Sequence, residues 1–259
     1  MKPTVVICPG AWQLESFFQR LKEAFKGLGY PTVCELANGY PDHDPANPPK
    51  INPDAAYLRE HVLKPRLEDG EDVVLFMHSY GGIYGPAALQ GLSKPERDRN
   101  GLKGGVIAAV YTAAFVAKKG TSAMSAMGFS PDRIPDWIDH DEATGYVSFK
   151  KEHAKFMVFH DLPEDEAEKL ASALPKQPYA CFSEPVHWDP YDDESFRGRL
   201  GYIYTEADRI LPLLIQERFT LTAGIQHTHM LKGCSHSPHL EMPEKLAETV
   251  VGMLDTLTR

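Results

Sequence analysis

Short apolar runs of strand length alternate with longer amphipathic stretches along most of the chain. The clearest run, residues 72–77 (DVVLFM), is almost continuously apolar, as expected of a strand buried on both faces of a parallel sheet. Shorter runs predict the other strands, at residues 4–8, 32–36, 106–111, 200–204 and 226–231. Amphipathic stretches predict helices at residues 14–28, 53–67, 81–92, 211–222 and 243–257, with Pro65 bending or ending the second. This alternation predicts a doubly wound, mostly parallel α/β sheet with helices on both faces.

The alternation stops after the strand at 106–111. Residues 115–186 are rich in Met, Pro, aromatic and acidic residues, with only short helical pieces among them. We therefore expect an α/β core made of residues 1–114 and 187–259, with a helical cap inserted at 115–186. A polar, proline-rich segment at 38–49 predicts a loop, because prolines at this density remove the backbone donors that a sheet needs.

Composition and charge narrow the class of protein. With 259 residues, of which 42% are hydrophobic and 24% charged, the chain is typical of a folded enzyme or binding domain. The net charge of −9, without a run of Lys or Arg, argues against nucleic acid as a partner. No stretch reaches the roughly 20 apolar residues that span a bilayer, and the first ten residues are too weakly apolar for a signal peptide, so we expect a cytoplasmic protein without membrane attachment. The 4 cysteines show no C-x-x-C spacing, which favours reduced thiols.

A serine follows the most apolar strand directly, in the sequence Met-His-Ser-Tyr-Gly-Gly at 77–82. A sharp turn from strand to helix would hold the hydroxyl of Ser79 clear of both elements, at the carboxyl edge of the sheet where open α/β sheets bind ligands. A serine hydroxyl is a weak nucleophile alone and needs a base and an orienting carboxylate. Two side chains later in the chain have the required order: Asp208 follows the strand at 200–204, and His236 follows the strand at 226–231. The pattern predicts a Ser-His-Asp triad.

Several neighbouring residues compete for these roles. Glu206 is two residues from Asp208 and is the alternative acid. His239 lies in the same loop as His236, and two further histidines at 227 and 229 lie on the preceding strand. The H-x-H pair there resembles part of a zinc site, but no acidic residue or Cys accompanies it at metal-ligand spacing, so we expect no metal. His78 is expected to pack beside the turn, because its side chain points away from that of Ser79.

With these motifs, the chain resembles the α/β-hydrolase superfamily, and most closely the cofactor-free branch of plant methyl-ester esterases and hydroxynitrile lyases with their fungal relatives. The resemblance covers nearly the full length. It depends on four segments, VVICPGAW near the start, HSYGG at the turn, YTEADRILP around the acid and GCSHSPHLEMPEKLA around the base. It implies that the backbone N–H groups of Ala11 and Tyr80 form the oxyanion hole.

Three positions depart from the pattern of that superfamily. Met77 stands where the turn usually has a small residue, and Pro9 stands where many relatives have histidine before the glycine. In the lyases a lysine follows the histidine of the triad, whereas Ser237 occupies that position here. Cyanohydrin cleavage is therefore disfavoured.

The resemblance implies a cofactor-independent carboxylic ester hydrolase, and the cap indicates its substrate. Met and aromatic residues with few cations favour a small apolar or aromatic ester or lactone, such as a secondary metabolite, although these side chains would serve equally as the cap's own core. The candidates for substrate binding are Trp12, Met124, Met127, Trp137, Phe156 and His187. Two other functions stay open: C–C bond hydrolysis or lyase or cyclase chemistry on a polyketide-like metabolite, and a small-molecule receptor with slow turnover. Caps in such folds can pair, which would give a homodimer.

Overall fold

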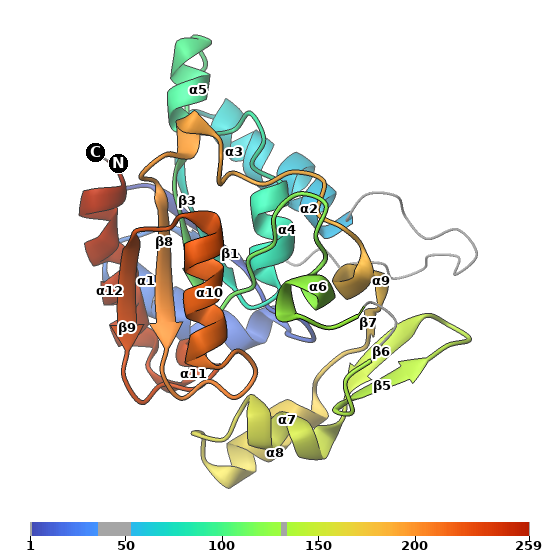
Figure 1. Cartoon of the computed structure of the whole chain (residues 1–259). Coiled ribbons are helices and arrows are strands. Elements are labelled where there is room, and N and C mark those ends of the chain that lie inside the picture. Colours follow the sequence, from blue (N-terminus) through green and yellow to red (C-terminus); the bar gives the residue numbers. More distant parts are fainter. Residues whose placement is uncertain (1, 36–52, 131–133, 259) are drawn as a thin grey trace.

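A six-stranded parallel sheet forms the centre of the molecule (Figure 1). The computed structural model describes residues 2–35, 53–130 and 134–258, so the predicted loop at 38–49 lies outside the described residues. The strand order is β2-β1-β3-β4-β8-β9, and every neighbouring pair is parallel. The strands are β1 (Thr4–Cys8), β2 (Thr32–Val33), β3 (Asp72–His78), β4 (Gly105–Thr112), β8 (Leu200–Thr205) and β9 (His227–Leu231). The predicted fold class is confirmed.

The sheet places the longest apolar run at its centre. Strand β3 lies between β1 and β4, and Val73 to His78 are all buried. Neither face of this strand meets water, which explains why its sequence is continuous in apolar residues instead of alternating. Because all six strands run in the same direction, the loops that follow β1, β3, β8 and β9 meet at one edge of the sheet.

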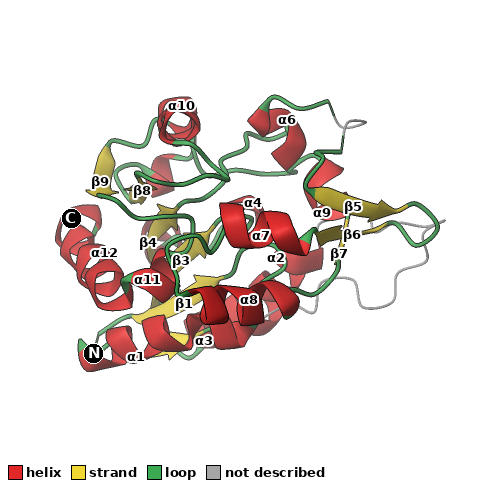
Figure 2. Cartoon of the chain, turned by 90° about the horizontal axis from the view of Figure 1, so that it is seen from below, coloured by secondary structure: helices red, strands yellow, loops and turns green. Residues whose placement is uncertain are grey.

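Helices cover both faces of the sheet (Figure 2). Helices α1 (Gln19–Gly27) and α12 (Pro243–Leu257) pack together on one face, and α4 (Gly81–Ala87) and α10 (Leu213–Ala223) lie on the other. Helix α12 buries an apolar stripe at helical spacing, formed by Leu246, Val250, Leu254 and Leu257. The remaining helices of the core are α2 (Pro53–Tyr57), α3 (Lys64–Glu68), α5 (Lys94–Arg99) and α11 (Pro238–Glu241), with 3₁₀ turns at Glu15–Phe18 and Glu194–Phe196.

Several predicted boundaries were wrong, and the helix predicted at 53–67 does not end at Pro65. A π-helical segment, Leu58–Leu63, joins α2 to α3, and Pro65 lies within α3, which continues to Glu68. The backbone departs from α-helical geometry in the turn before the proline, which has no N–H to donate. The second strand ends at Val33, and the helix predicted at 81–92 ends at Ala87.

The segment between β4 and β8 is not purely helical, which corrects the predicted helical cap at 115–186. It contains a three-stranded antiparallel sheet of order β5-β6-β7 as well as four short helices (Figure 1). The strands are β5 (Ile138–Asp141), β6 (Tyr146–Phe149) and β7 (Gln177–Pro178). The helices are α6 (Ala123–Met127), α7 (Lys151–Met157), α8 (Glu164–Ser172) and α9 (Ala180–Ser183). We call residues 115–186 the cap segment below.

Within residues 2–35, 53–130 and 134–258, no helix is both long and apolar enough to cross a bilayer.

Candidate active site

Ser79 lies on a strained turn between β3 and α4. Its φ of 51° is in the left-handed region, which residues other than glycine rarely adopt. Backbone hydrogen bonds hold the turn on both sides. The Ser79 N–H donates to Thr112 O (3.4 Å). The Ser79 carbonyl accepts from the N–H groups of Gly82 and Phe115 (both 3.0 Å). The serine hydroxyl is thereby fixed at the edge of the sheet, where the sequence predicted it.

Two glycines allow α4 to approach the sheet closely. A Cβ on Gly81 would lie 2.2 Å from Cys8 O, and a Cβ on Gly82 would lie 2.1 Å from Phe115 O, so neither position admits a side chain. Met77, the departure from the family pattern, does not crowd the turn, because its side chain packs against Gly85, where a Cβ would lie 2.8 Å from the Met77 sulfur. Gly85 therefore compensates for the larger residue.

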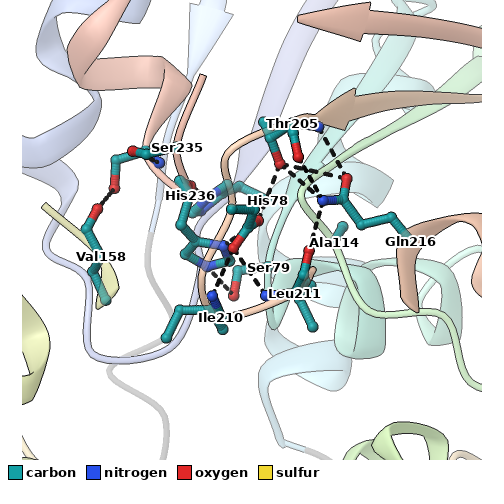
Figure 3. A network of polar contacts seen from close by, with 12 residues as sticks. His78, Ser79, Ala114, Val158, Thr205, Ile210, Leu211, Gln216, Ser235 and His236 are labelled. Carbon is teal, nitrogen blue, oxygen red and sulfur yellow. Dashed lines mark hydrogen bonds and ion pairs between the residues drawn. The ribbon is translucent and has the colours of Figure 1, made fainter. Parts of the chain in front are cut away.

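The three predicted triad residues form one hydrogen-bonded chain. His236 Nε2 lies 3.0 Å from Ser79 Oγ (Figure 3). On the other side of the ring, His236 Nδ1 lies 2.8 Å from Asp208 Oδ2. All three residues are buried, with exposed fractions of 4–6%. Since an ionised carboxylate only accepts hydrogen bonds, the proton of the neutral imidazole belongs on Nδ1, which leaves Nε2 free to accept from the serine hydroxyl.

Local hydrogen bonds hold Asp208 in place and exclude Glu206 from its role. Asp208 Oδ1 accepts from the N–H groups of Ile210 and Leu211 (both 2.8 Å), and Oδ2 also accepts from the hydroxyl of Thr205 (3.0 Å). The carboxylate of Glu206 instead accepts from Gly233 N–H, which ties together the loops after β8 and β9. The predicted acid is therefore the one that reaches the imidazole.

His78 connects two loops of the site through the two nitrogens of its ring. Its Nε2 lies 2.7 Å from the backbone carbonyl of His236, and its Nδ1 lies 3.0 Å from Gln13 Oε1, which also accepts from Gly10 N–H. Burial, together with the neighbouring imidazoles of His239 and His236, lowers the pKa of His78 well below its usual value. A neutral His78 connects the loop after β1 to the loop that carries His236.

The two residues predicted to form the oxyanion hole lie close to Ser79 along the chain or in the same cavity. Ala11 is in the loop after β1 and lines the same cavity as Ser79, and Tyr80 directly follows Ser79 at the start of α4. The phenol of Tyr80 donates to Asp54 Oδ2 (3.0 Å), and burial raises the pKa of that carboxyl to about 6. Tyr80 is thus anchored at its side chain next to the nucleophile. The donor roles of the two backbone N–H groups stay a prediction.

An apolar cavity lies over Ser79 and His236, between the core and the cap segment. Four of the predicted binding residues line it: Trp12, Met124, Met127 and Trp137. The other described lining residues are Gln13, Phe115, Ala123, Phe129, Pro135, Ile138, Phe149, Val158, Phe159, Leu174, Phe182 and Ile210, with Ala11 at its base. No described lining residue is Asp, Glu, Lys or Arg.

The structure corrects two predicted binding residues. Phe156 is 62% exposed and its ring packs under the guanidinium of Arg209 (4.3 Å), because it lies on the outer side of α7. His187 is also exposed and does not line the cavity. Residue type alone does not distinguish these two positions from the residues that line the cavity, since aromatic residues occur on both sides of the short cap helices.

The sequence interpretation missed part of the cavity. Phe149 on β6 and Phe182 on α9 pack their rings against Trp12, with centroids 5.3 and 4.9 Å away. Residues 146–149 alternate between partly buried and buried positions, the period of a strand, but four residues are too few to identify one. Gln13 gave no signal, because a lone polar residue after a strand has no chemical pattern.

In the part of the chain that the structure describes, no group of three or more His, Cys, Asp or Glu side chains has the geometry to hold a metal ion. His227 and His229, whose spacing resembled part of a zinc site, lie on β9, and neither is among the described residues that line the cavity.

Comparison with known proteins assigns the family. The profile of the alpha/beta hydrolase family matches residues 5–249, so this chain belongs to that family and is a hydrolase. It is 27% identical over 256 residues to the probable hydrolase R7 of Phoma sp., covering 97% of this chain and 98% of the relative.

Two solved structures share the fold over almost the full length. Polyneuridine aldehyde esterase has a TM-score of 0.75 at 16% identity, covering 98% of this chain and 99% of its own. Tomato methylketone synthase I, complexed with 2-tridecanone, has a TM-score of 0.76 at 14% identity, with 98% of each chain covered. These findings confirm the resemblance to this superfamily.

Proposed function

We propose that this protein is a serine hydrolase that cleaves small apolar or aromatic carboxylic esters or lactones through an acyl-enzyme on Ser79. The observation that carries the proposal is the continuous chain from Ser79 Oγ through the imidazole of His236 to Asp208, at the floor of an uncharged apolar cavity. A hydroxyl, a base within hydrogen-bond reach and an oriented carboxylate are the parts that acyl transfer needs.

In the first half of the reaction, His236 Nε2 takes the proton of Ser79 as the hydroxyl oxygen attacks the substrate carbonyl. The carbonyl oxygen becomes an anion, which the N–H groups of Ala11 and Tyr80 stabilise. Asp208 stabilises the imidazolium that forms and fixes its orientation. When the tetrahedral intermediate collapses, the imidazolium returns its proton to the leaving alcohol, and the acyl group stays on Ser79.

In the second half, water replaces the alcohol. His236 removes a proton from the water as its oxygen attacks the acyl carbonyl, and the same oxyanion donors act again. Collapse of this intermediate breaks the bond to Ser79 Oγ, which regains its proton from His236. For a lactone both products remain in one molecule.

The lining of the cavity supports a neutral, largely apolar substrate. Among the described residues that line it, the polar side chains besides the triad serine and histidine are Gln13 and Trp12, whose indole N–H already donates to Val147 O (3.1 Å). A carboxylate or phosphate bound there would lose its hydration without a charged partner, which costs several kcal/mol. Tomato methylketone synthase I, which shares the fold, holds the apolar ketone 2-tridecanone.

Covalent labelling and turnover test the proposal together. The wild-type protein is expected to react with a fluorophosphonate at Ser79 and to hydrolyse para-nitrophenyl butyrate, and Ser79→Ala is expected to lose both properties. Full turnover in Ser79→Ala would contradict the nucleophile. A protein that labels at Ser79, leaves a panel of aryl esters and lactones intact and cleaves a β-diketone would contradict ester specificity in favour of C–C hydrolysis. Tight ligand binding without labelling or turnover would favour a receptor.

A further inference from the structure

The backbone next to the predicted oxyanion donor Ala11 is held in an unusual conformation. Trp12 has a φ of 56°, in the left-handed region that favours glycine. Such a conformation persists only where surrounding contacts hold it. The peptide that carries the Trp12 N–H also carries the carbonyl of Ala11, so a change at Trp12 would rotate the chain at Ala11.

The contacts that hold Trp12 come from the cap segment, more than 130 residues away in sequence. The backbone N–H of Trp12 donates to the side-chain oxygen of Gln177 (2.9 Å), and the indole N–H donates to the carbonyl of Val147 (3.1 Å). Val147 on β6 and Gln177 on β7 are paired directly across the antiparallel sheet. One cross-strand pair therefore accepts hydrogen bonds from both N–H groups of Trp12.

Ring packing holds the side chain between these two bonds. The indole stacks on Phe182 and meets the rings of Phe149 and Trp137 edge-on, with centroids 4.9, 5.3 and 6.2 Å away. Packing fixes the ring, but it does not fix the direction of the backbone N–H. Gln177 is the contact that does.

We infer that Gln177 is a positioning residue for acyl transfer: its amide oxygen holds the Trp12 peptide so that the N–H of Ala11 points at the developing oxyanion. The inference rests on the function proposed above. It means that the cap segment contributes to the rate of the chemical step as well as enclosing the substrate. An oxyanion donor acts mainly in the transition state, so its misplacement lowers kcat more than it changes KM.

The variant Gln177→Met tests this inference, because it keeps the length of the side chain and removes the oxygen. With para-nitrophenyl butyrate, kcat is expected to fall about tenfold while KM stays within about twofold, less than the loss of a whole oxyanion donor. The affinity for a short alkyl trifluoromethyl ketone, which forms an oxyanion when Ser79 adds to it, is expected to fall by a similar factor. The affinity for the corresponding methyl ketone is expected to stay unchanged.

A neighbouring change provides the control. Ser148→Ala lies on β6 beside Val147 and leaves both bonds to Trp12 in place, so it is expected to behave as the wild type in all four measurements. An unchanged kcat in Gln177→Met would overturn the inference. So would a raised KM with kcat preserved, since Gln177 would then only hold the cap segment in place.

A second variant acts on the same peptide from the other side. Trp12→Phe removes the indole donor and keeps an aromatic ring, so the backbone N–H of residue 12 still donates to Gln177, and the variant is expected to lower kcat less than Gln177→Met does. The reverse order would overturn the inference in favour of ring packing. A wild-type protein that neither turns over the ester nor labels at Ser79 would instead overturn the proposed function, and this inference with it.

Discussion

At the scale of the residue, the site depends on how each polar group is held. The Asp208 carboxylate accepts two hydrogen bonds from its own loop and one from Thr205 at the end of β8, in addition to that from His236, so its orientation is fixed before substrate arrives. Glu206 has the same charge only two residues away, but it is committed to Gly233. The two carboxylates are chemically alike, but only that of Asp208 contacts the imidazole of His236.

This difference gives a direct prediction for the acid. Asp208→Asn is expected to lower kcat by about 10⁴, because an amide in this position favours the wrong tautomer of His236. Steady-state kinetics with para-nitrophenyl butyrate measure the effect. Glu206→Gln is the matched control and is expected to keep kcat within a fewfold. Equal losses in the two variants would show that the carboxylates act through the general charge of the site.

A second residue-scale prediction concerns stability in acid. His239 is fully buried against Phe18, with ring centroids 4.2 Å apart, and burial lowers its pKa to about 3. Between that value and the ordinary pKa of 6.5, the unfolded chain binds a proton that the folded protein does not. The free energy of unfolding therefore decreases as the pH falls through this window, by up to about 1.4 kcal/mol per pH unit from this group.

Denaturant unfolding at several pH values between 7 and 5 measures this slope. His239→Phe is expected to decrease it by up to about 1.4 kcal/mol per pH unit, whatever the packing change does to the absolute stability. Burial also lowers the pKa of His78, so the contribution of His78 to the slope is expected to remain in both proteins. Identical slopes in the wild type and the variant would show that His239 is protonated in the folded state or that its pKa is not lowered.

At the scale of the element, the turn after β3 requires α4 to begin almost in contact with the sheet. The carbonyl of Phe115 occupies the space where a Cβ of Gly82 would lie. The N–H of the same residue, Phe115, donates a hydrogen bond to the carbonyl of Ser79. A side chain at Gly82 would thus displace the strand-to-helix turn and the chain that leaves β4 together.

Gly82→Ala is accordingly expected to destabilise the protein by about 1–3 kcal/mol and to abolish most turnover, because overpacking must move backbone. Gly252 on α12 gives a matched control, since a Cβ there meets nothing within 4 Å. Gly252→Ala is expected to stabilise the protein by up to about 1 kcal/mol through helix propensity, without a change in activity. Denaturant unfolding and ester kinetics measure both. A Gly82→Ala protein as stable and active as the wild type would contradict the close approach.

At the scale of the whole molecule, charge is distributed unequally between surface and cavity. The chain carries a net charge of −9, whereas none of the described residues lining the cavity is Asp, Glu, Lys or Arg. A charged substrate would meet repulsion outside if anionic and an unpaired desolvation cost inside. We therefore expect selection against charged substrates to arise from the assembled molecule.

Matched esters test this selectivity. The neutral methyl para-butyryloxybenzoate is expected to have a kcat/KM at least about 10² above that of para-butyryloxybenzoate, which carries a carboxylate in the leaving group, because burying that charge costs about 3 kcal/mol or more. The two compounds place the same acyl group at the same bond. Equal values of kcat/KM would mean that the leaving group stays in water and that the cavity holds only the acyl part.

The core was predictable because its signals are local and strong. Continuous apolar runs identify the strands of a parallel sheet, and one rule of topology then brings the loops after β3, β8 and β9 to the same edge. Ser79, Asp208 and His236 could be chosen in this way without coordinates. The cap segment gave weaker signals, since strands of two to four residues are too short for a period to appear. Phe156 was accordingly assigned to the wrong side of its helix.

The parallel sheet, the turn at Ser79 and the order of the triad could be predicted from the amino-acid sequence, because each follows from hydrophobic period, glycine placement and chain order. Three findings required the folded structure: which aromatic residues face the cavity, that Asp208 and not Glu206 reaches the imidazole, and that Gln177 binds the peptide after Ala11. These outcomes depend on contacts between residues far apart in the chain, and a contact between two such residues leaves no periodic trace in either segment.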